Sequence, residues 1–280
     1  MEQAQQKEAE ALSVQSVPQQ AVEQACFHPL RLISRNCEYL EQRLGRSGAD
    51  AVSLQAVRDI GTEAARLERT LGEVLDLLEY LQDEEEPPMV PLDLRQLLGQ
   101  FEAQADMIQS QLGVTLTLDC KEGACRVLAS QEDVQRLCLH LLSNALRACQ
   151  PGGRVQLALC RRQDAWQLTV EDDGCGLPDS GGDAWVENRR SFLGGAQLGL
   201  LLCRESCRRM GWSLELQQAS PRGTRAVVTI PLPGQQALEQ EWDLCAGETN
   251  VVREQDHYRL RAMLVREMRT MPERWDPDEE

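Results

Sequence analysis

The chain has 280 residues, enough for two modest domains, and a formal net charge of −16. Lysine occurs only as Lys7 and Lys121. This balance argues against a nucleic-acid partner, because affinity for a phosphate backbone comes from clustered lysine and arginine. No Gly-Lys-Ser or Gly-Lys-Thr triplet is present, which excludes a P-loop.

The 11 cysteines and the polar start of the chain indicate a reducing compartment, so we expect a cytoplasmic protein. No apolar run approaches the roughly 18 residues of a membrane helix, and we expect no membrane span. The cysteines do not have zinc-finger spacing with histidine, and they are typical of small buried apolar residues.

Residues 1–20 are rich in glutamine and glutamate and predict a disordered N-terminus. Apolar residues recur every three or four positions over 21–44 and again over 51–82, with "GRSGAD" between them. The region 21–86 is therefore expected to form an antiparallel helical hairpin. One hairpin cannot cover both of its apolar faces, so we expect a homodimer with a four-helix bundle. The alternative is that the hairpin packs on its own downstream domain.

The segment "DEEEPP" ends the second helix and indicates a linker. The region 87–233 then mixes helical and strand patterns and predicts an α+β sandwich, with helices on one face of a mixed sheet. Expected helices cover 92–112, 130–149 (capped by Ser130) and 196–211; expected strands cover 114–120, 154–162 and 166–173, with a last pair around "SPRG". The region 234–280 is an acidic extension with one probable helix, 253–271, and its default interpretation is a solvated tail.

Three short motifs follow one another in the second domain. The first is Asn144 within "HLLSNALRA", the second is "DDGCGLP" at 172–178, and the third is "GGAQLGLLL" at 194–202. Asp172 offers an acceptor to the exocyclic amine of adenine, and Gly174 and Gly176 let the backbone approach the purine. The polar loop 177–193 is typical of a mobile lid over phosphates.

The glycines of the third motif expose backbone N–H groups to phosphate at a helix N-terminus. Asn144 offers a neutral oxygen to Mg²⁺, a cation that prefers hard oxygen ligands. Arg147 lies one turn further along the same helix and can face the same phosphates. The three motifs together predict a site for Mg-ATP.

These motifs resemble the successive boxes of sensor histidine kinases and of the wider gyrase/Hsp90/MutL ATPase superfamily. The resemblance covers about 92–232 and extends more weakly to 21–82, which resembles the dimerisation and phosphoacceptor hairpin. It implies that Asn144 binds magnesium and Asp172 binds adenine. It also implies that Gly174, Gly176, Gly195 and Gly199 are glycine-box residues and that Thr224 supports the adenine site.

The segment "FHPLRLISRNCEYL" resembles the histidine box, which makes His28 the expected phosphoacceptor. A histidine that attacks a γ-phosphate needs a neutral ring and a carboxylate to orient it, and here Pro29 takes the place of the family's acidic residue. The alternative interpretation is a histidine that begins a helix. Pro29 is expected to break or start the helix at His28.

Two further positions depart from the family: His140 replaces the first asparagine of its Asn-x-x-x-Asn pattern, and Gln197 replaces a glycine. We interpret His140 as facing the site. Three functions remain open: a histidine kinase that uses ATP and Mg²⁺ and phosphorylates a response regulator receiver domain; a degenerate nucleotide-binding module; and a kinase of serine on a partner, which the long hairpin disfavours.

Overall fold

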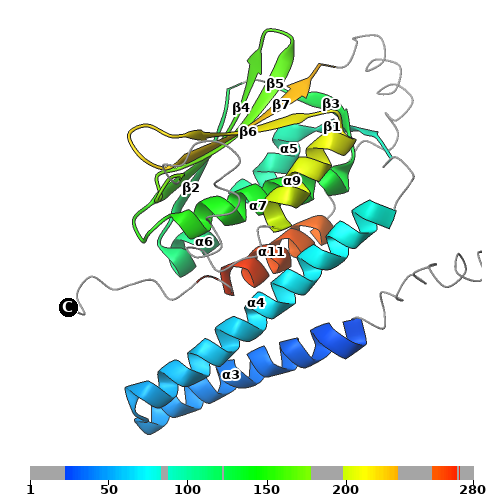
Figure 1. Ribbon diagram of the computed structural model, residues 1–280. Coiled ribbons are helices and arrows are strands. Elements are labelled where there is room, and N and C mark those ends of the chain that lie inside the picture. Colours follow the sequence, from blue (N-terminus) through cyan, green and yellow to red (C-terminus); the bar gives the residue numbers. More distant parts are fainter. Residues whose placement is uncertain are drawn as a thin grey trace, which may run out of the picture. The chain divides into compact units, whose positions relative to one another are not determined.

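The computed structural model describes residues 23–82, 88–121, 123–177, 198–232, 254–269 and 271 (Figure 1). The chain divides into two compact units, Met1–Arg69 and Thr70–Glu280, called here the N-terminal and C-terminal units. The division lies inside a long helix, whereas the sequence placed a boundary near residue 86. Among the described residues, no helix combines the length and apolar character that a bilayer crossing requires.

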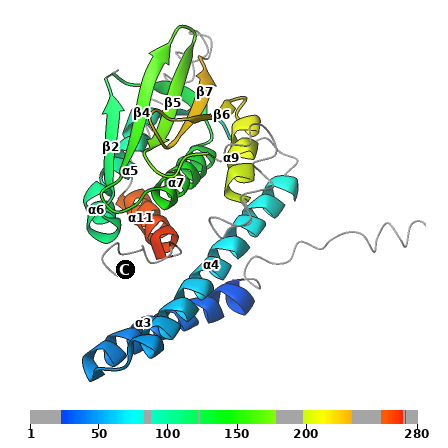
Figure 2. The ribbon, with the colours of Figure 1, turned by 60° about the vertical axis from the view of Figure 1, so that its left-hand side comes forward.

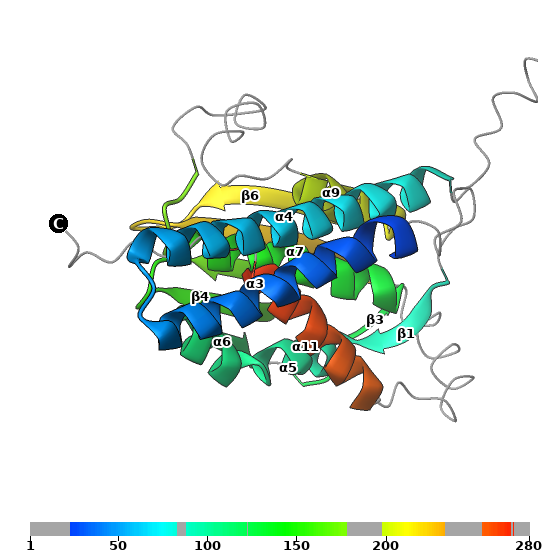
Figure 3. The same cartoon turned by 90° about the horizontal axis from the view of Figure 1, so that it is seen from below.

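The N-terminal unit is a helical hairpin, in which α3 (His28–Ser47) lies beside α4 (Ala51–Gln82) (Figure 3). A π-helical turn, Glu23–Phe27, precedes α3. The turn uses Gly48 at φ 71°, and the side chain of Asp50 then accepts a hydrogen bond from the Ser53 amide at 2.9 Å. The two helices read from the apolar spacing are therefore present.

Small side chains let α3 and α4 approach closely. A Cβ added to Gly61 would lie 3.2 Å from Cys37 Cβ, and Ala64 and Ala65 are buried beside it. Ion pairs join the helices at Arg31–Glu68 (2.9 Å) and Arg58–Glu41 (2.7 Å). Large apolar side chains nevertheless remain exposed on both helices: Leu32, Ile33, Leu40, Val52, Ile60 and Leu67.

The C-terminal unit is an α+β sandwich built on a five-stranded sheet of order β2-β4-β5-β7-β6. Only the first pair is parallel, so the sheet is mixed. Helices α5, α7 and α9 cover one face (Figure 2). The strands are β2 (Thr115–Cys120), β4 (Arg154–Arg162), β5 (Ala165–Asp172), β6 (Ser213–Gln218) and β7 (Thr224–Pro231); the helices are α5 (Leu94–Glu102), α7 (Gln131–Ala148) and α9 (Leu198–Arg209).

The prediction of one helix over 92–112 is wrong. The stretch contains the end of β1 (Val90–Asp93), then α5, and then α6 (Ala105–Leu112). Asp93 ends the strand and caps α5, because its side chain accepts from the Arg95 amide at 3.0 Å and from the Cys125 amide at 3.1 Å. The second contact lies beside β3 (Arg126–Ala129), a short strand that pairs with β1 and that the sequence did not reveal.

The solvated interpretation of the tail is also wrong. Helix α11 (Glu254–Arg269) packs on α5 and α7, and its apolar stripe belongs to the same core as the sheet. The buried side chains are Leu260, Leu264, Met268 and Met271, at helical spacing. The expected helix is therefore present, as a packed part of the sandwich.

A buried polar cluster holds the last turns of α4 within the C-terminal unit. The Tyr80 hydroxyl lies 2.6 Å from Asp133 Oδ1 and 2.8 Å from Ser206 Oγ. Its ring lies beneath two guanidinium groups, with Arg136 at 5.1 Å and Arg209 at 4.8 Å from the centroid. Burial raises the pKa of Tyr80 far above its usual value, so the hydroxyl stays protonated and donates a hydrogen bond to Asp133.

We expect Tyr80→Phe to lower the free energy of unfolding of the C-terminal unit by about 1–3 kcal/mol, because the buried Asp133 carboxylate loses a donor. Urea unfolding measures this change. Tyr39→Phe is the control, since Tyr39 is 57% exposed, and its effect should stay within about 0.5 kcal/mol. Equal effects of the two substitutions would contradict the assignment.

Candidate functional site

A small cavity lies where α7, the end of β5 and the start of β7 meet. It brings together three of the residues that the sequence singled out, Asn144, Asp172 and Thr224. The remaining lining is mostly apolar, as in sites that hold a flat organic ring. The lining residues are Leu141, Asn144, Ala145, Ala148, Val170, Asp172, Leu177, Leu200, Leu216, Thr224 and Ala226.

The Asp172 carboxylate is the fixed polar group of this cavity. It is 5% exposed, and its Oδ1 accepts hydrogen bonds from the Gly174 amide at 3.0 Å and the Thr224 amide at 3.2 Å. Buried carboxylates need such donors, because an unsatisfied one is costly. Two backbone segments therefore orient Asp172 as a fixed hydrogen-bond acceptor.

Two glycines allow these backbone segments to meet. A Cβ on Gly174 would lie 2.3 Å from the Ala148 carbonyl oxygen, at the end of α7. Gly223 has φ +105°, and a Cβ there would lie 1.8 Å from the Asp172 carbonyl oxygen. Gly223 lies outside the three sequence motifs, although its place directly before Thr224 in a turn was a usable signal.

The Thr224 hydroxyl is the second polar group at the cavity. Its oxygen is buried and, among the described residues, has no hydrogen-bond partner. Native proteins satisfy most buried polar atoms, so such an atom at the wall of a cavity indicates a ligand. Thr224 Oγ1 and the Asp172 carboxylate together suit a heterocycle with donors and acceptors on one edge.

Asn144 lines the same cavity from α7, where its amide is a possible metal ligand. Among the described residues, no three histidine, cysteine, aspartate or glutamate side chains gather as a metal site. A single amide oxygen fits a Mg²⁺ ion that takes its other ligands from phosphate and water. Gly199 lies in the first turn of α9, next to the lining residue Leu200.

Arg147 differs from the expectation that it faces phosphate. Its Nη2 lies 3.6 Å from Glu267 Oε2 and 3.3 Å from the Glu267 carbonyl oxygen, on α11. Ser143 donates to the same carboxylate at 2.6 Å, and Glu267 is only 1% exposed. The Arg147 guanidinium is therefore held by the tail helix, and Arg147 does not line the cavity.

His140 is also outside the cavity lining and is 4% exposed within α7. Gly195, Gln197 and the expected lid lie outside the described residues. The buried cysteines behave as the sequence indicated, because burial raises the pKa of Cys138 and Cys207 to about 12 and keeps both as thiols.

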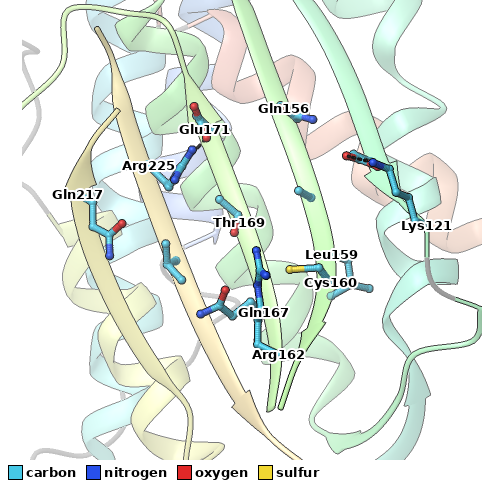
Figure 4. A pocket seen from close by; sticks show the side chains of 13 residues that line it. Lys121, Gln156, Leu159, Cys160, Arg162, Gln167, Thr169, Glu171, Gln217 and Arg225 are labelled. Carbon is cyan, nitrogen blue, oxygen red and sulfur yellow. Dashed lines mark hydrogen bonds and ion pairs between the residues drawn. The ribbon is translucent and has the colours of Figure 1, made fainter. Parts of the chain in front are cut away.

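A larger hollow of about 470 Å³ lies on the face of the sheet that the helices leave open (Figure 4). Four of its charged side chains form two pairs, because Arg225 lies 2.7 Å from Glu171 and Lys121 lies 3.9 Å from Asp119; Arg162 also lines it. These side chains occupy alternate positions along the strands, as solvent-facing residues of a sheet do. Volume alone therefore does not make it the functional site.

In the N-terminal unit, His28 is exposed and is the first residue of α3. Pro29 fits the first turn of this helix, where its missing N–H costs no hydrogen bond. Pro29 therefore lies where the π-helical turn Glu23–Phe27 gives way to α3, and it does not interrupt α3. One turn later, Arg31 lies over the Phe27 ring at 5.7 Å while it pairs with Glu68.

A known protein family matches part of the C-terminal unit. The family described as "Histidine kinase-, DNA gyrase B-, and HSP90-like ATPase" matches residues 129–234. The chain therefore contains an ATPase domain of this family, which is a nucleotide-binding class of domain.

Within that class, the chain is related to sensor histidine kinases. The alginate biosynthesis sensor protein KinB of Pseudomonas aeruginosa is 26% identical over 188 residues, covering 66% of this chain and 31% of KinB. The sensor protein DivL of Caulobacter vibrioides is 32% identical over 151 residues, covering 54% of this chain and 19% of DivL. The chain thus matches no more than about a third of the length of either relative.

Solved structures show the same fold. The histidine kinase ThkA in complex with the response regulator protein TrrA has a TM-score of 0.52 at 18% identity, covering 82% of this chain and 66% of that one. Full-length ShkA in complex with AMPPNP has a TM-score of 0.52 at 19% identity, covering 73% and 45%.

We expect Gly223→Ala to lower the free energy of unfolding by about 2 kcal/mol or more, because it strains a left-handed residue and drives a methyl group into the Asp172 carbonyl. Thermal and urea unfolding measure this. Gly99→Ala in α5 is the control: nothing lies within 4 Å of its added Cβ, and it should stabilise by about 0.5–1 kcal/mol. A neutral result at Gly223 would refute the close approach.

Glu267→Gln should destabilise the C-terminal unit by on the order of 3 kcal/mol, because it removes one charge of a buried ion pair. Glu205→Gln is the control, since its partner Arg208 is 73% exposed and such pairs contribute less than about 1 kcal/mol. Urea unfolding of both variants distinguishes a packed α11 from a loosely attached one, for which the two substitutions would have similar effects.

Proposed function

We propose that the chain is a histidine kinase that binds Mg-ATP, autophosphorylates on His28 and passes the phosphoryl group to an aspartate of a response regulator receiver domain. The observation that carries the proposal is the convergence of Asp172, Thr224 and Asn144 on one cavity, where the buried Thr224 hydroxyl has no hydrogen-bond partner among the described residues. The kinase relatives support it.

In this proposal, Asp172 accepts a hydrogen bond from the exocyclic amine of adenine, and the Thr224 hydroxyl binds the same edge of the base. Gly174 and Gly176 let the chain run close to the purine. Gly195 and Gly199 supply backbone donors to phosphate, and the Asn144 amide oxygen holds Mg²⁺, which lowers the charge repulsion met by an attacking nucleophile.

The chemistry assigned to His28 is a phosphoryl transfer. A neutral imidazole nitrogen attacks the γ-phosphorus in line, an N–P bond forms, the bond to the bridging oxygen breaks and ADP leaves. The receiver aspartate then attacks the phosphohistidine and releases the imidazole. The exposed position of His28 at the start of α3 leaves its ring accessible for both steps.

The exposed apolar side chains of α3 and α4 support a homodimer, in which a second hairpin covers them in a four-helix bundle. The ThkA structure contains a response regulator protein, which supports a receiver domain as the partner here. A reducing cytoplasm is the proposed location, since the buried Cys138, Cys203 and Cys207 form no disulfide.

The second candidate function is a nucleotide-binding module that acts through partners with little phosphotransfer. Three observations favour it: Pro29 stands where an acidic residue would assist His28, His140 does not line the cavity, and Arg147 is held by Glu267. None of these affects the adenine end of the site, so nucleotide binding is common to both functions.

Incubation of the purified full chain with γ-labelled Mg-ATP tests the proposal, beside His28→Ala, Asp172→Asn and the exposed control Asp164→Asn. We expect an acid-labile, alkali-stable label in the wild type and the control, and a loss of at least about 100-fold in the other two. His28→Ala removes the nucleophile, and Asp172→Asn turns an NH2 donor toward the adenine amine, because the Gly174 and Thr224 amides hold the remaining oxygen. No label in the wild type, with ATP binding that Asp172→Asn abolishes, would establish the binding module instead.

A further inference from the structure

The loop that carries Gly174 and Gly176 is held from outside by the turn between β6 and β7. We propose that Arg222 and Gln218 are positioning residues for the nucleotide, because each fixes one end of this loop. The inference rests on the proposed nucleotide site and adds to it two side chains that none of the sequence motifs includes.

Arg222 holds the start of the loop. Its Nε donates to the Gly174 carbonyl oxygen at 2.7 Å, a charge-assisted hydrogen bond. On the other side, the Cys175 amide donates to the Ala148 carbonyl at 3.1 Å, at the end of α7. The first half of the loop is therefore clamped between the helix that bears Asn144 and the β6–β7 turn.

Gln218 holds the end of the loop. Its Oε1 accepts from the Leu177 amide at 2.9 Å, and Leu177 lines the cavity. A Cβ on Gly176 would lie 2.5 Å from Gln218 Nε2, so the glutamine amide lies directly on the glycine. Gly176 has φ +75°, and its absent side chain makes room for this contact. Leu177 also begins the loop that the sequence assigns to the lid.

The turn that carries Arg222 and directly follows Gln218, the last residue of β6, is itself fixed to Asp172. Thr224 directly follows the turn, and its amide donates to Asp172 Oδ1 at 3.2 Å. Within the turn, the Ala219 amide donates to the Gly223 carbonyl at 3.0 Å. Asp172, the glycine loop and the β6–β7 turn thus form one hydrogen-bonded unit, in which Arg222 and Gln218 set the shape of the loop and Asp172 binds the base.

The test uses Arg222→Met and Gln218→Met, which keep the length of the side chain but remove its hydrogen-bond donor or acceptor. They are compared with Arg222→Lys, which retains a donor, and Gln218→Glu, which retains an acceptor. Arg225→Met is the matched control, because it removes the same charge from β7 on the opposite face of the sheet. Calorimetry gives Kd for Mg-ATP and Mg-ADP, autophosphorylation gives KM and kcat, and thermal unfolding gives Tm.

We expect both methionine variants to raise Kd and KM about three- to tenfold, as loss of one hydrogen bond does, with kcat within about twofold. The lysine and glutamate variants and the control should stay within about twofold of the wild type in Kd. An altered Tm with unchanged Kd would overturn the inference, because it would show a structural role alone.

If the wild type binds no nucleotide, or if Asp172→Asn binds as well as the wild type, the proposed function itself fails. If Asp172→Asn abolishes binding but both methionine variants bind normally, only this inference fails.

Discussion

The close approach of three backbone segments at the end of β5 is the constraint on which the candidate site depends. The Ala148 carbonyl, the Asp172 carbonyl and the turn before β7 come so near that only glycine fits at 174 and 223. This contact lets two backbone amides reach the Asp172 carboxylate, and it closes the cavity between α7 and the sheet. The Asp172 carboxylate, the proposed acceptor for adenine, is therefore oriented by main-chain atoms, which substitution of neighbouring side chains alters little.

Local signals predicted most of the fold. The helical hairpin, α7 with its Ser130 cap, and the antiparallel strands all depend on patterns contained within a single element, and these elements are present. The failure at 92–112 has a different cause: Asp93 ends a strand and caps a helix because it also binds the Cys125 amide, 32 residues away. β3 has only four residues, too few for an alternating pattern to emerge, and its pairing with β1 depends on tertiary structure.

The meeting of the predicted residues at one cavity was predictable because they lie in motifs whose spacing reflects local chain geometry. Asp172, Asn144 and Thr224 do meet at one cavity. Arg147 was assigned by its spacing from Asn144 alone, and spacing could not reveal a competing partner on α11. That partner is Glu267, an acidic residue within the apolar stripe of α11. Its charge favoured the interpretation of the tail as solvated. Gln218 and Arg222 act through side-chain contacts with a distant loop, which no local pattern encodes.

Helix α7 consequently lines the cavity on one side and binds α11 on another. Asn144 faces the cavity, whereas the adjacent Ser143 and Arg147 bind the buried Glu267 carboxylate. A buried ion pair contributes little net stability compared with an apolar contact, but removal of one partner is costly, so its main effect is to select one arrangement. Leu260, Leu264 and Met268 supply apolar burial without direction, whereas the Glu267 contacts are directional and place the carboxylate beside Ser143. The tail helix thus defines the position of the helix that carries the proposed magnesium ligand, which makes α11 a structural part of the ATPase domain in this chain.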